Sequence, residues 1–255
     1  MLALGGLLVA RLLPVTFVAP FFGGPLVPAP VKIAVAVALA VLLFPSARAS
    51  LGGPLPEGSL LYVGLLFKEL LVGFAIAFVT SLVFRAAEMA GQAVDVLRGA
   101  NLATALAPEL GERVSVFADF WVQTLVVLFL ALGGHRVFLV AFAHSYAVLP
   151  LAAFPEPALG LWPATEWILS LTGNLLAVAL ALAAPALAAL FLADVVLGLM
   201  ARVAPQIQVF FLGMPLKALL AVAMVFLAAE ALLVALQGGL GQMLGDLGRF
   251  LELLR

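Results

Sequence analysis

The sequence contains few side chains that could carry out chemistry. Its two histidines, His135 and His144, have no carboxylate three or four residues further along, which favours ordinary loop or interface positions over a metal site or a proton relay. Cysteine is absent, which excludes disulfides, thiolate metal sites and cysteine nucleophiles. No Ser-His-Asp order, paired carboxylates or phosphate-binding loop stands out. We therefore predict no catalytic residue, no metal site and no cofactor.

One predicted helix carries a polar stripe. Arg85, Glu88, Gln92 and Asp95 recur at spacings of three and four, which places them on one helix face. The simple interpretation is an exposed helix extension with local pairs such as Arg85–Glu88. We favour a stripe that lines an aqueous passage or a subunit seam, because a glycine-bearing break follows directly. The opposite face carries small residues that permit close helix approach, namely Ala86, Ala87, Ala90, Gly91 and Ala93.

Further charges lie inside or beside apolar runs. Each costs about 2.5–3.5 kcal/mol at the centre of a lipid-facing helix. They are tolerable where they pair, reach the membrane surface or face a wet cavity. Helix-end positions at the interface are the simple alternative. These charges are Arg11, Lys32, Lys68, Glu69, Asp119, Asp194, Lys217 and Glu230.

The composition indicates which elements must hold these side chains. Hydrophobic residues make up 66% of the 255 residues, against roughly 45–50% in ordinary soluble domains, and charged residues only 10%, against about 25%. A soluble fold cannot hide so much apolar surface. The net charge of −1 provides no excess of positive charge for binding nucleic acid. No positive region precedes the apolar stretch from Leu2, so we expect the N-terminal segment to be retained.

Proline and glycine divide this integral membrane sequence into helical segments. Pro45 ends the second segment, and Pro185 must bend or break the sixth. After the last apolar segment the tail is amphipathic, with apolar residues from Leu240 to Leu254 on one stripe. The predicted helices cover residues 2–19, 31–44, 59–98, 114–132, 137–149, 164–202 and 209–236.

Two stretches carry a family pattern: Lys68–Phe78 continuing through Ala86–Gln92, and Leu197–Lys217, in which Ala204-Pro205-Gln206 and Gly213-Met214-Pro215-Leu216 are the most specific parts. Both resemble the FliR/SctT family, the export-gate subunit of type III secretion systems in flagella and injectisomes. The similarity covers nearly the whole chain. The tripeptide Arg98-Gly99-Ala100 resembles the injectisome branch more than the flagellar one.

The resemblance implies an all-α, polytopic membrane protein of helical hairpins. Residues 1–165 resemble a FliP-type subunit, and residues 166–255 resemble a FliQ-type hairpin, at about 184–236, followed by the amphipathic tail. In the family, FliP/SctR-type and FliQ/SctS-type partners join this subunit in a channel for unfolded proteins across the bacterial inner membrane. FlhB/SctU-type and FlhA/SctV-type export proteins are further implied partners, and nucleic acid is not one.

The resemblance also implies two sets of site residues. A plug loop at 99–113 helps to close the channel, and glycine within it accepts backbone angles that other residues avoid. Its matching residues are Gly99, Ala100, Asn101, Leu102, Ala103, Thr104, Pro108 and Gly111. The FliQ-like hairpin turn is matched by Arg202, Pro205, Gln206, Gly213, Pro215 and Lys217.

Two other classes of protein compete with this interpretation. A small-molecule secondary transporter would have similar broken helices and midplane charges, but it should carry inverted repeats, which the sequence does not display. An intramembrane enzyme would need a catalytic cluster that the sequence lacks. We therefore predict an export-gate subunit that is not an enzyme.

Overall fold

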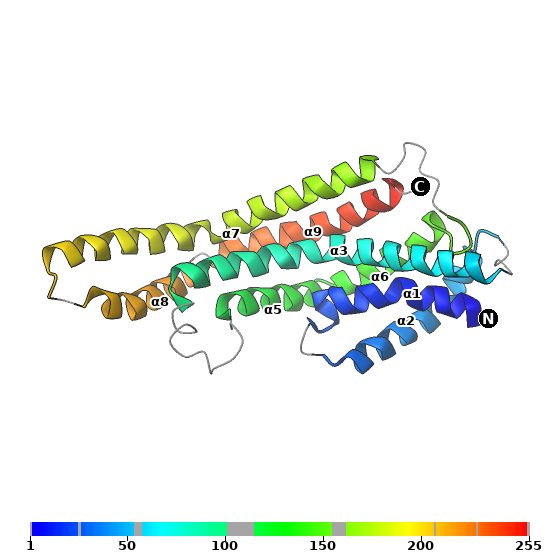
Figure 1. The fold of residues 1–255 in the computed structure, drawn as a ribbon, viewed down its shortest axis with the longest axis horizontal. Helices are drawn as coiled ribbons and strands as arrows, with labels where there is room; N and C mark the ends of the chain where they lie inside the picture. The colour runs from blue at the N-terminus through cyan, green and yellow to red at the C-terminus, as the bar shows by residue number, and fades with distance from the viewer. Residues whose placement is uncertain are drawn as a thin grey trace. The chain divides into compact units, whose positions relative to one another are not determined.

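The computed structural model describes residues 2–24, 27–53, 58–100, 115–154, 162–206, 208–227 and 229–253. Within these ranges the chain forms helices and no strand, which confirms the all-α prediction (Figure 1). The helices are α1 Leu2–Val18, α2 Ala29–Ala49, α3 Ser59–Leu97, α5 Val116–Ala131, α6 Gly134–Val148, α7 Trp162–Val203, α8 Val209–Leu227 and α9 Ala229–Leu253, with a short 3-10 helix at Pro20–Phe22.

Several of these helices are long and apolar enough to cross a membrane. They are Ala29–Ala49, Ser59–Leu97 and Thr165–Val203. The helices α5 and α6 pass the same test only as a pair, and this pair is bent by 76°. The structure therefore confirms a polytopic membrane protein.

The chain forms two compact units. The first contains Met1–Val83, Val126–Thr172 and Gly239–Arg255, and the second contains Phe84–Leu125 and Gly173–Gly238. The helices α3, α5, α7 and α9 therefore contribute residues to both units. The expected division near residue 165 concerns likeness to two other subunits, and it stays a prediction.

In the first unit, α1 packs on α2, and α2 packs against α6. The backbones of α1 and α3 approach closely at Gly73, where an added Cβ would lie 2.1 Å from the carbonyl oxygen of Arg11. Aromatic rings fill the space near the end of α1, and the Phe21 ring lies 4.7 Å from that of Phe129 and 5.0 Å from that of Phe138, measured between centroids. Backbone proximity therefore brings the polar residues of α1 within reach of α3.

In the second unit, α3 and α5 lie side by side (Figure 1). A Cβ added to Gly91 would lie 2.3 Å from the backbone nitrogen of Ala118. Ala86, Ala87 and Ala90 are fully or almost fully buried on α3. The predicted small-residue face for close helix packing is confirmed.

The end of the second helix differs from the sequence-based expectation. The second helix does not end at Pro45 but continues to Ala49. Pro185, which was expected to bend or break its helix, lies inside α7 and does not break it. A proline removes one backbone donor, and a membrane helix tolerates this where neighbouring helices, Ser/Thr side chains, water or a local adjustment of the helix satisfy the carbonyl that is left free. The last apolar segment is described as α8 up to Leu227 and, from Ala229 onward, as the first part of α9.

The tail forms α9, and its predicted apolar stripe is buried at Leu240, Met243 and Leu247. This confirms the amphipathic tail as far as the structure describes its side chains.

Candidate functional site

The end of α3 holds the first group of predicted site residues, and Asp95 organises it. The Asp95 carboxylate accepts hydrogen bonds from Arg98 Nε at 2.5 Å and from Ser115 Oγ at 2.5 Å. It also accepts one from the backbone N–H of Phe117 at 3.0 Å. The Asp95 side chain is only 5% exposed. One buried carboxylate therefore contacts residues that precede and follow the predicted plug loop.

This arrangement has a local physical cause. Ser115 immediately precedes α5, where the first backbone N–H groups have no partner within the helix. A carboxylate placed there satisfies one of these donors and is favoured by the positive end of the helix dipole. The Arg98 guanidinium also lies 5.2 Å from the centroid of the Phe117 ring. Asp95 therefore acts as a cap for α5 that is supplied by another helix.

The structure separates Asp95 from the rest of the polar stripe. Arg85 Nη1 lies 2.7 Å from Glu88 Oε2, and Gln92 Nε2 donates a longer hydrogen bond of 3.4 Å to Glu88 Oε1. The Arg85 side chain is 52% exposed and that of Glu88 is 32% exposed. The local Arg85–Glu88 pair that the spacing predicts is confirmed. Asp95, in contrast, is buried by its contacts with Arg98, Ser115 and Phe117, which the spacing does not predict.

Only the first two residues of the predicted plug loop lie in the described part of the chain. Gly99 has a φ of +87°, in the left-handed region that favours glycine, and its N–H donates to the carbonyl of Val96 at 3.1 Å. Ala100 is half-buried. The remaining predicted loop residues lie outside the described residues, namely Asn101, Leu102, Ala103, Thr104, Pro108 and Gly111.

The predicted hairpin is formed by α7 and α8 (Figure 1). Arg202 lies in the last turn of α7, and Pro205 and Gln206 lie in the turn that follows. Gly213 of α8 is buried, and an added Cβ would lie 3.0 Å from the Leu197 side chain of α7. Packing at Gly213 therefore brings the two helices of the hairpin together.

The lysine of the family pattern joins this hairpin to α3. Lys217 lies two residues after Pro215 on α8 and forms an ion pair with Asp194 of α7. Its Nζ also lies 3.4 Å from the carbonyl oxygen of Leu97, the last residue of α3. A cation near the last carbonyls of a helix is electrostatically favoured. Asp194 is 42% exposed, so this ion pair is only partly shielded from its surroundings.

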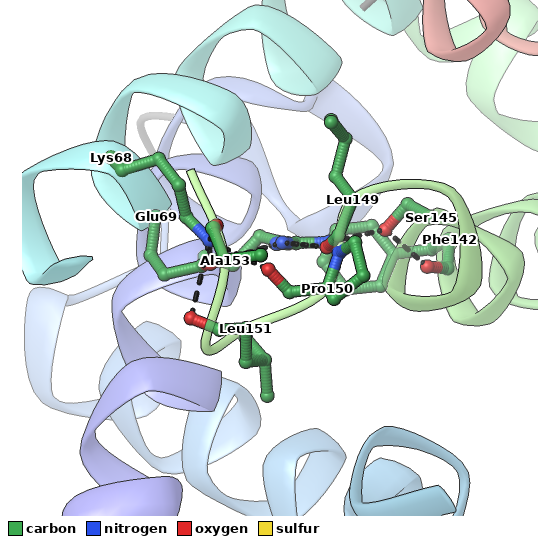
Figure 2. A network of polar contacts seen from close by, with 9 residues as sticks. Lys68, Glu69, Phe142, Ser145, Leu149, Pro150, Leu151 and Ala153 are labelled. Atoms are coloured by element: carbon green, nitrogen blue, oxygen red, sulfur yellow. Dashed lines mark hydrogen bonds and ion pairs between the residues drawn. The ribbon is translucent and has the colours of Figure 1, made fainter. Parts of the chain in front are cut away.

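The first unit contains a separate network of buried charges, shown in Figure 2. The Arg11 guanidinium of α1 and the Glu69 carboxylate of α3 are paired and fully buried. Two contacts join them, one from Nε to Oε2 and one from Nη2 to Oε1 at 3.0 Å. Arg11 also donates to Ser145 Oγ at 3.1 Å and to the Leu149 carbonyl at 2.8 Å. The Arg11 side chain thus connects α1, α3 and the end of α6.

Lys68, the neighbour of Glu69, holds the turn after α6. Its Nζ lies 2.6 Å from Glu69 Oε1 and donates to the carbonyl oxygens of Pro150, Leu151 and Ala153 at 2.8, 3.2 and 2.9 Å (Figure 2). Two cations and one carboxylate leave an excess positive charge in the network. Carbonyl dipoles beyond the negative end of α6 face that charge and offset it. The network therefore fixes the backbone path of residues 150–153, which follow α6.

The remaining predicted charges have simpler environments. Lys32 is buried, with its Nζ 5.4 Å from the centroid of the Phe17 ring. Asp119 and Glu230 are exposed. His144 is exposed, and His135 is half-buried with an Nδ1 that lacks a hydrogen-bond partner. Among the described residues, no three of the metal-ligating types histidine, cysteine, aspartate and glutamate lie close enough together to hold a metal ion.

Sequence reasoning found the charges of both sites but missed their partners. Ser115 precedes an apolar run, which is a recognised start signal for a helix, yet nothing in the sequence connects it to Asp95. The backbone carbonyls that hold Lys68 carry no sequence signal. Among the predicted residues, the structure brings Arg11 to Glu69 and Asp194 to Lys217, and it does not bring Asp95 to Glu88.

Several known proteins are similar to this chain in sequence. The chain is 38% identical over 157 residues to Yop proteins translocation protein T of Yersinia pestis, which covers 62% of this chain and 59% of that protein. It is 31% identical over 222 residues to Surface presentation of antigens protein SpaR of Shigella flexneri, covering 87% and 83%. Flagellar biosynthetic protein FliR of Bacillus subtilis is 29% identical over 220 residues, covering 86% and 83%.

The match spans less than two thirds of the length of the Yersinia relative. Residues 2–243 match the family described as bacterial export proteins, family 1. This match confirms the predicted resemblance. The chain belongs to the bacterial export protein family 1, the family of FliR and SctT.

Proposed function

We propose that this protein is the FliR/SctT-type export-gate subunit of a type III secretion apparatus, and that it performs no chemistry of its own. The observation that carries the proposal is the family match over residues 2–243. Within the apparatus, the chain would join FliP/SctR-type and FliQ/SctS-type subunits to form the channel for unfolded proteins. FlhB/SctU-type and FlhA/SctV-type proteins would lie beside it, in the bacterial inner membrane.

Helix length supports a need for partner subunits. The helix α7 has 42 residues. At about 1.5 Å per residue it measures about 63 Å, roughly twice the thickness of a bilayer core of about 30 Å. Apolar side chains are exposed along its whole length, including Leu169, Leu192 and Val203. Lipid alone cannot cover both halves of such a helix, so other protein chains are the natural cover.

The relatives favour the injectisome branch. Identity to the translocation and surface-presentation proteins is 38% and 31%, against 29% and 27% for the FliR proteins of Bacillus subtilis and Escherichia coli. This order agrees with the Arg98-Gly99-Ala100 tripeptide. The substrates would then be secreted proteins and not flagellar components.

Residues 99–113 would act as the plug, with Arg85, Glu88, Gln92 and Asp95 along the channel or a subunit seam. The contacts of Asp95 with Arg98 and Ser115 support a defined base for that loop. The hairpin turn that contains Arg202, Pro205 and Gln206 would correspond to the turn of a FliQ-type subunit, with Gly213, Pro215 and Lys217 on its second helix. Deleting residues 99–113 in cells that express the partner subunits tests the plug. Ion leakage through an assembled complex is the expected result, and an intact barrier would assign closure to another segment.

Purification tests the function itself. A tagged chain expressed with its export-apparatus neighbours should co-purify with the FliP- and FliQ-type subunits in fixed proportion, and a strain that lacks it should lose secretion. A chain that is stable and monodisperse alone, with no enrichment of these subunits, would support the alternative of a small-molecule secondary transporter.

A further inference from the structure

The second unit exposes a face on α3 and α5 that carries both polar and large apolar side chains. We propose that this face packs against a helix of a neighbouring subunit, and that this helix presents a basic side chain to Asp119. The proposal rests on the proposed function, since it requires the chain to work inside an assembly. It adds Asp119 and Gln123 of α5 to a surface that the sequence located on α3 alone.

The two helices run antiparallel within this unit. Asp95, near the end of α3, contacts Ser115 at the start of α5. One turn earlier in α3, the backbone of Gly91 approaches that of Ala118, which lies further along α5. Successive turns of α3, followed backwards, therefore lie beside successive turns of α5.

The polar residues of both helices lie on one side of this pair. On α3, Gln92 precedes Asp95 by about one turn. On α5, Asp119 and Gln123 follow Ser115 by about one and two turns. Because Asp95 and Ser115 touch, the row on α3 and the row on α5 run next to each other. Gln92, Asp119 and Gln123 are all exposed.

Asp119 is the charge on this face that still needs a partner. The charges Arg85 and Glu88 on the α3 side of this face pair with each other at 2.7 Å. No described residue places a cation within ion-pair distance of Asp119. An ionised side chain within membrane-crossing helices normally pairs or faces water. The complementary group for a lone carboxylate is a lysine or arginine.

The apolar residues of the same face identify what covers it. Val116 and Phe120 alternate with Asp119 and Gln123 along α5, and they are 55% and 56% exposed. A water-filled passage would leave these large apolar groups wet, and lipid would leave the carboxylate without a partner. Protein interfaces combine apolar contacts with hydrogen bonds and charge pairs. A helix of another subunit satisfies both kinds of side chain.

Photo-crosslinking in the assembled apparatus tests the proposal. A photoreactive amino acid at Gln123 should crosslink to one export-apparatus subunit, at a peptide that contains a lysine or arginine. Asp119→Lys should lower the yield of assembled complex at least about tenfold, and Asp119→Asn should lower it only a few-fold. Reversing the charge of the crosslinked basic residue should restore assembly to the Asp119→Lys variant. Glu230→Lys is the matched control for charge reversal at an exposed acid of a helix.

The other outcomes overturn the proposal in distinguishable ways. Crosslinks from Gln123 to an exported protein in transit would show that the face lines the passage. Crosslinks to lipid alone, or none, in a complex that contains all its subunits would show that no subunit covers it. Failure of the unsubstituted chain to co-purify with any export subunit would overturn the proposed function together with this inference.

Discussion

Arg11 and Glu69 lie 58 positions apart in the sequence and form a fully buried pair between α1 and α3. The close backbone approach at Gly73, one turn after Glu69, allows this contact. The pair shares its carboxylate with Lys68, so one negative charge serves two cations. The consequences of removing each member are therefore unequal.

Glu69→Gln should be the most damaging substitution in this network. It leaves two buried cations without a carboxylate, and breaking a buried pair in this way costs about 3–5 kcal/mol. Arg11→Gln should cost less, because the Lys68–Glu69 pair remains. The midpoint of thermal unfolding in detergent measures the order. If Arg11→Gln proves more harmful than Glu69→Gln, the shared carboxylate is not the centre of the network.

Lys68→Met should loosen the turn at residues 150–153, because three carbonyl oxygens lose their common donor. Unsatisfied buried groups cost about 1–3 kcal/mol each, with partial relief by rearrangement. Lys68→Arg should rescue this loss only in part, since a guanidinium holds all its N–H donors in one plane, whereas an ammonium directs three donors tetrahedrally from a single atom. Limited proteolysis between α6 and α7 provides the readout, with Lys32→Met as the control. Equal protection of Lys68→Met and the unsubstituted protein would contradict the prediction.

Gly73→Ala should destabilise the protein, because the new Cβ would collide with the backbone of Arg11. Forced packing of this kind costs about 1–3 kcal/mol. Gly5→Ala is the matched control in α1, since no atom lies within 4 Å of the added Cβ. That control should be neutral or stabilising by up to about 1 kcal/mol through helix propensity. The melting temperatures of Gly73→Ala and Gly5→Ala test whether the collision at Gly73 destabilises the protein.

Asp95→Ala should free the start of α5, since Ser115 and the Phe117 N–H lose their acceptor. We expect a loss of about 1–3 kcal/mol and faster hydrogen exchange at the first amides of α5. Glu88→Ala removes an exposed pair and should change stability by less than about 1 kcal/mol. Both variants should impair assembly or transport if the proposal for the polar stripe holds. Unchanged assembly and transport in both would remove that role.

Lys217→Met should have a small effect on the stability of the isolated protein. Its partner Asp194 is 42% exposed, and ion pairs of this kind contribute about 0–1 kcal/mol. That contribution should shrink further at high salt. Thermal unfolding at low and high ionic strength measures it. A loss as large as that of Glu69→Gln would mean that the Leu97 contact matters more than its length suggests.

Element type was predictable from the sequence because each apolar run is long and bounded by glycine and proline. The long helix α3 was expected at 59–98 and is found at Ser59–Leu97, since its helical periodicity continues up to the break at Gly99. Pro45 did not mark the end of the second helix, because a proline weakens a helix without ending it where other contacts stabilise the helix. Local pattern therefore located the helices better than their ends.

Side-chain partners were less predictable than helices. Spacing within one helix correctly paired Arg85 with Glu88. Spacing cannot reveal that Arg11 meets Glu69, because that contact depends on how two helices cross. Asp95 shows the same limit, since spacing placed it on one stripe with Arg85, Glu88 and Gln92, whereas tertiary contacts with α5 bury it.

The buried Arg11–Glu69 pair also constrains how the protein is made. The ribosome produces α1 before α3, so Arg11 has no carboxylate partner until Glu69 has been synthesised. A lone arginine at the centre of a helix in lipid costs about 2.5–3.5 kcal/mol during insertion. We therefore expect α1 to wait at the translocon or the membrane surface and to enter the bilayer together with α3. In this protein, the order of helix insertion would then differ from the order of helix synthesis.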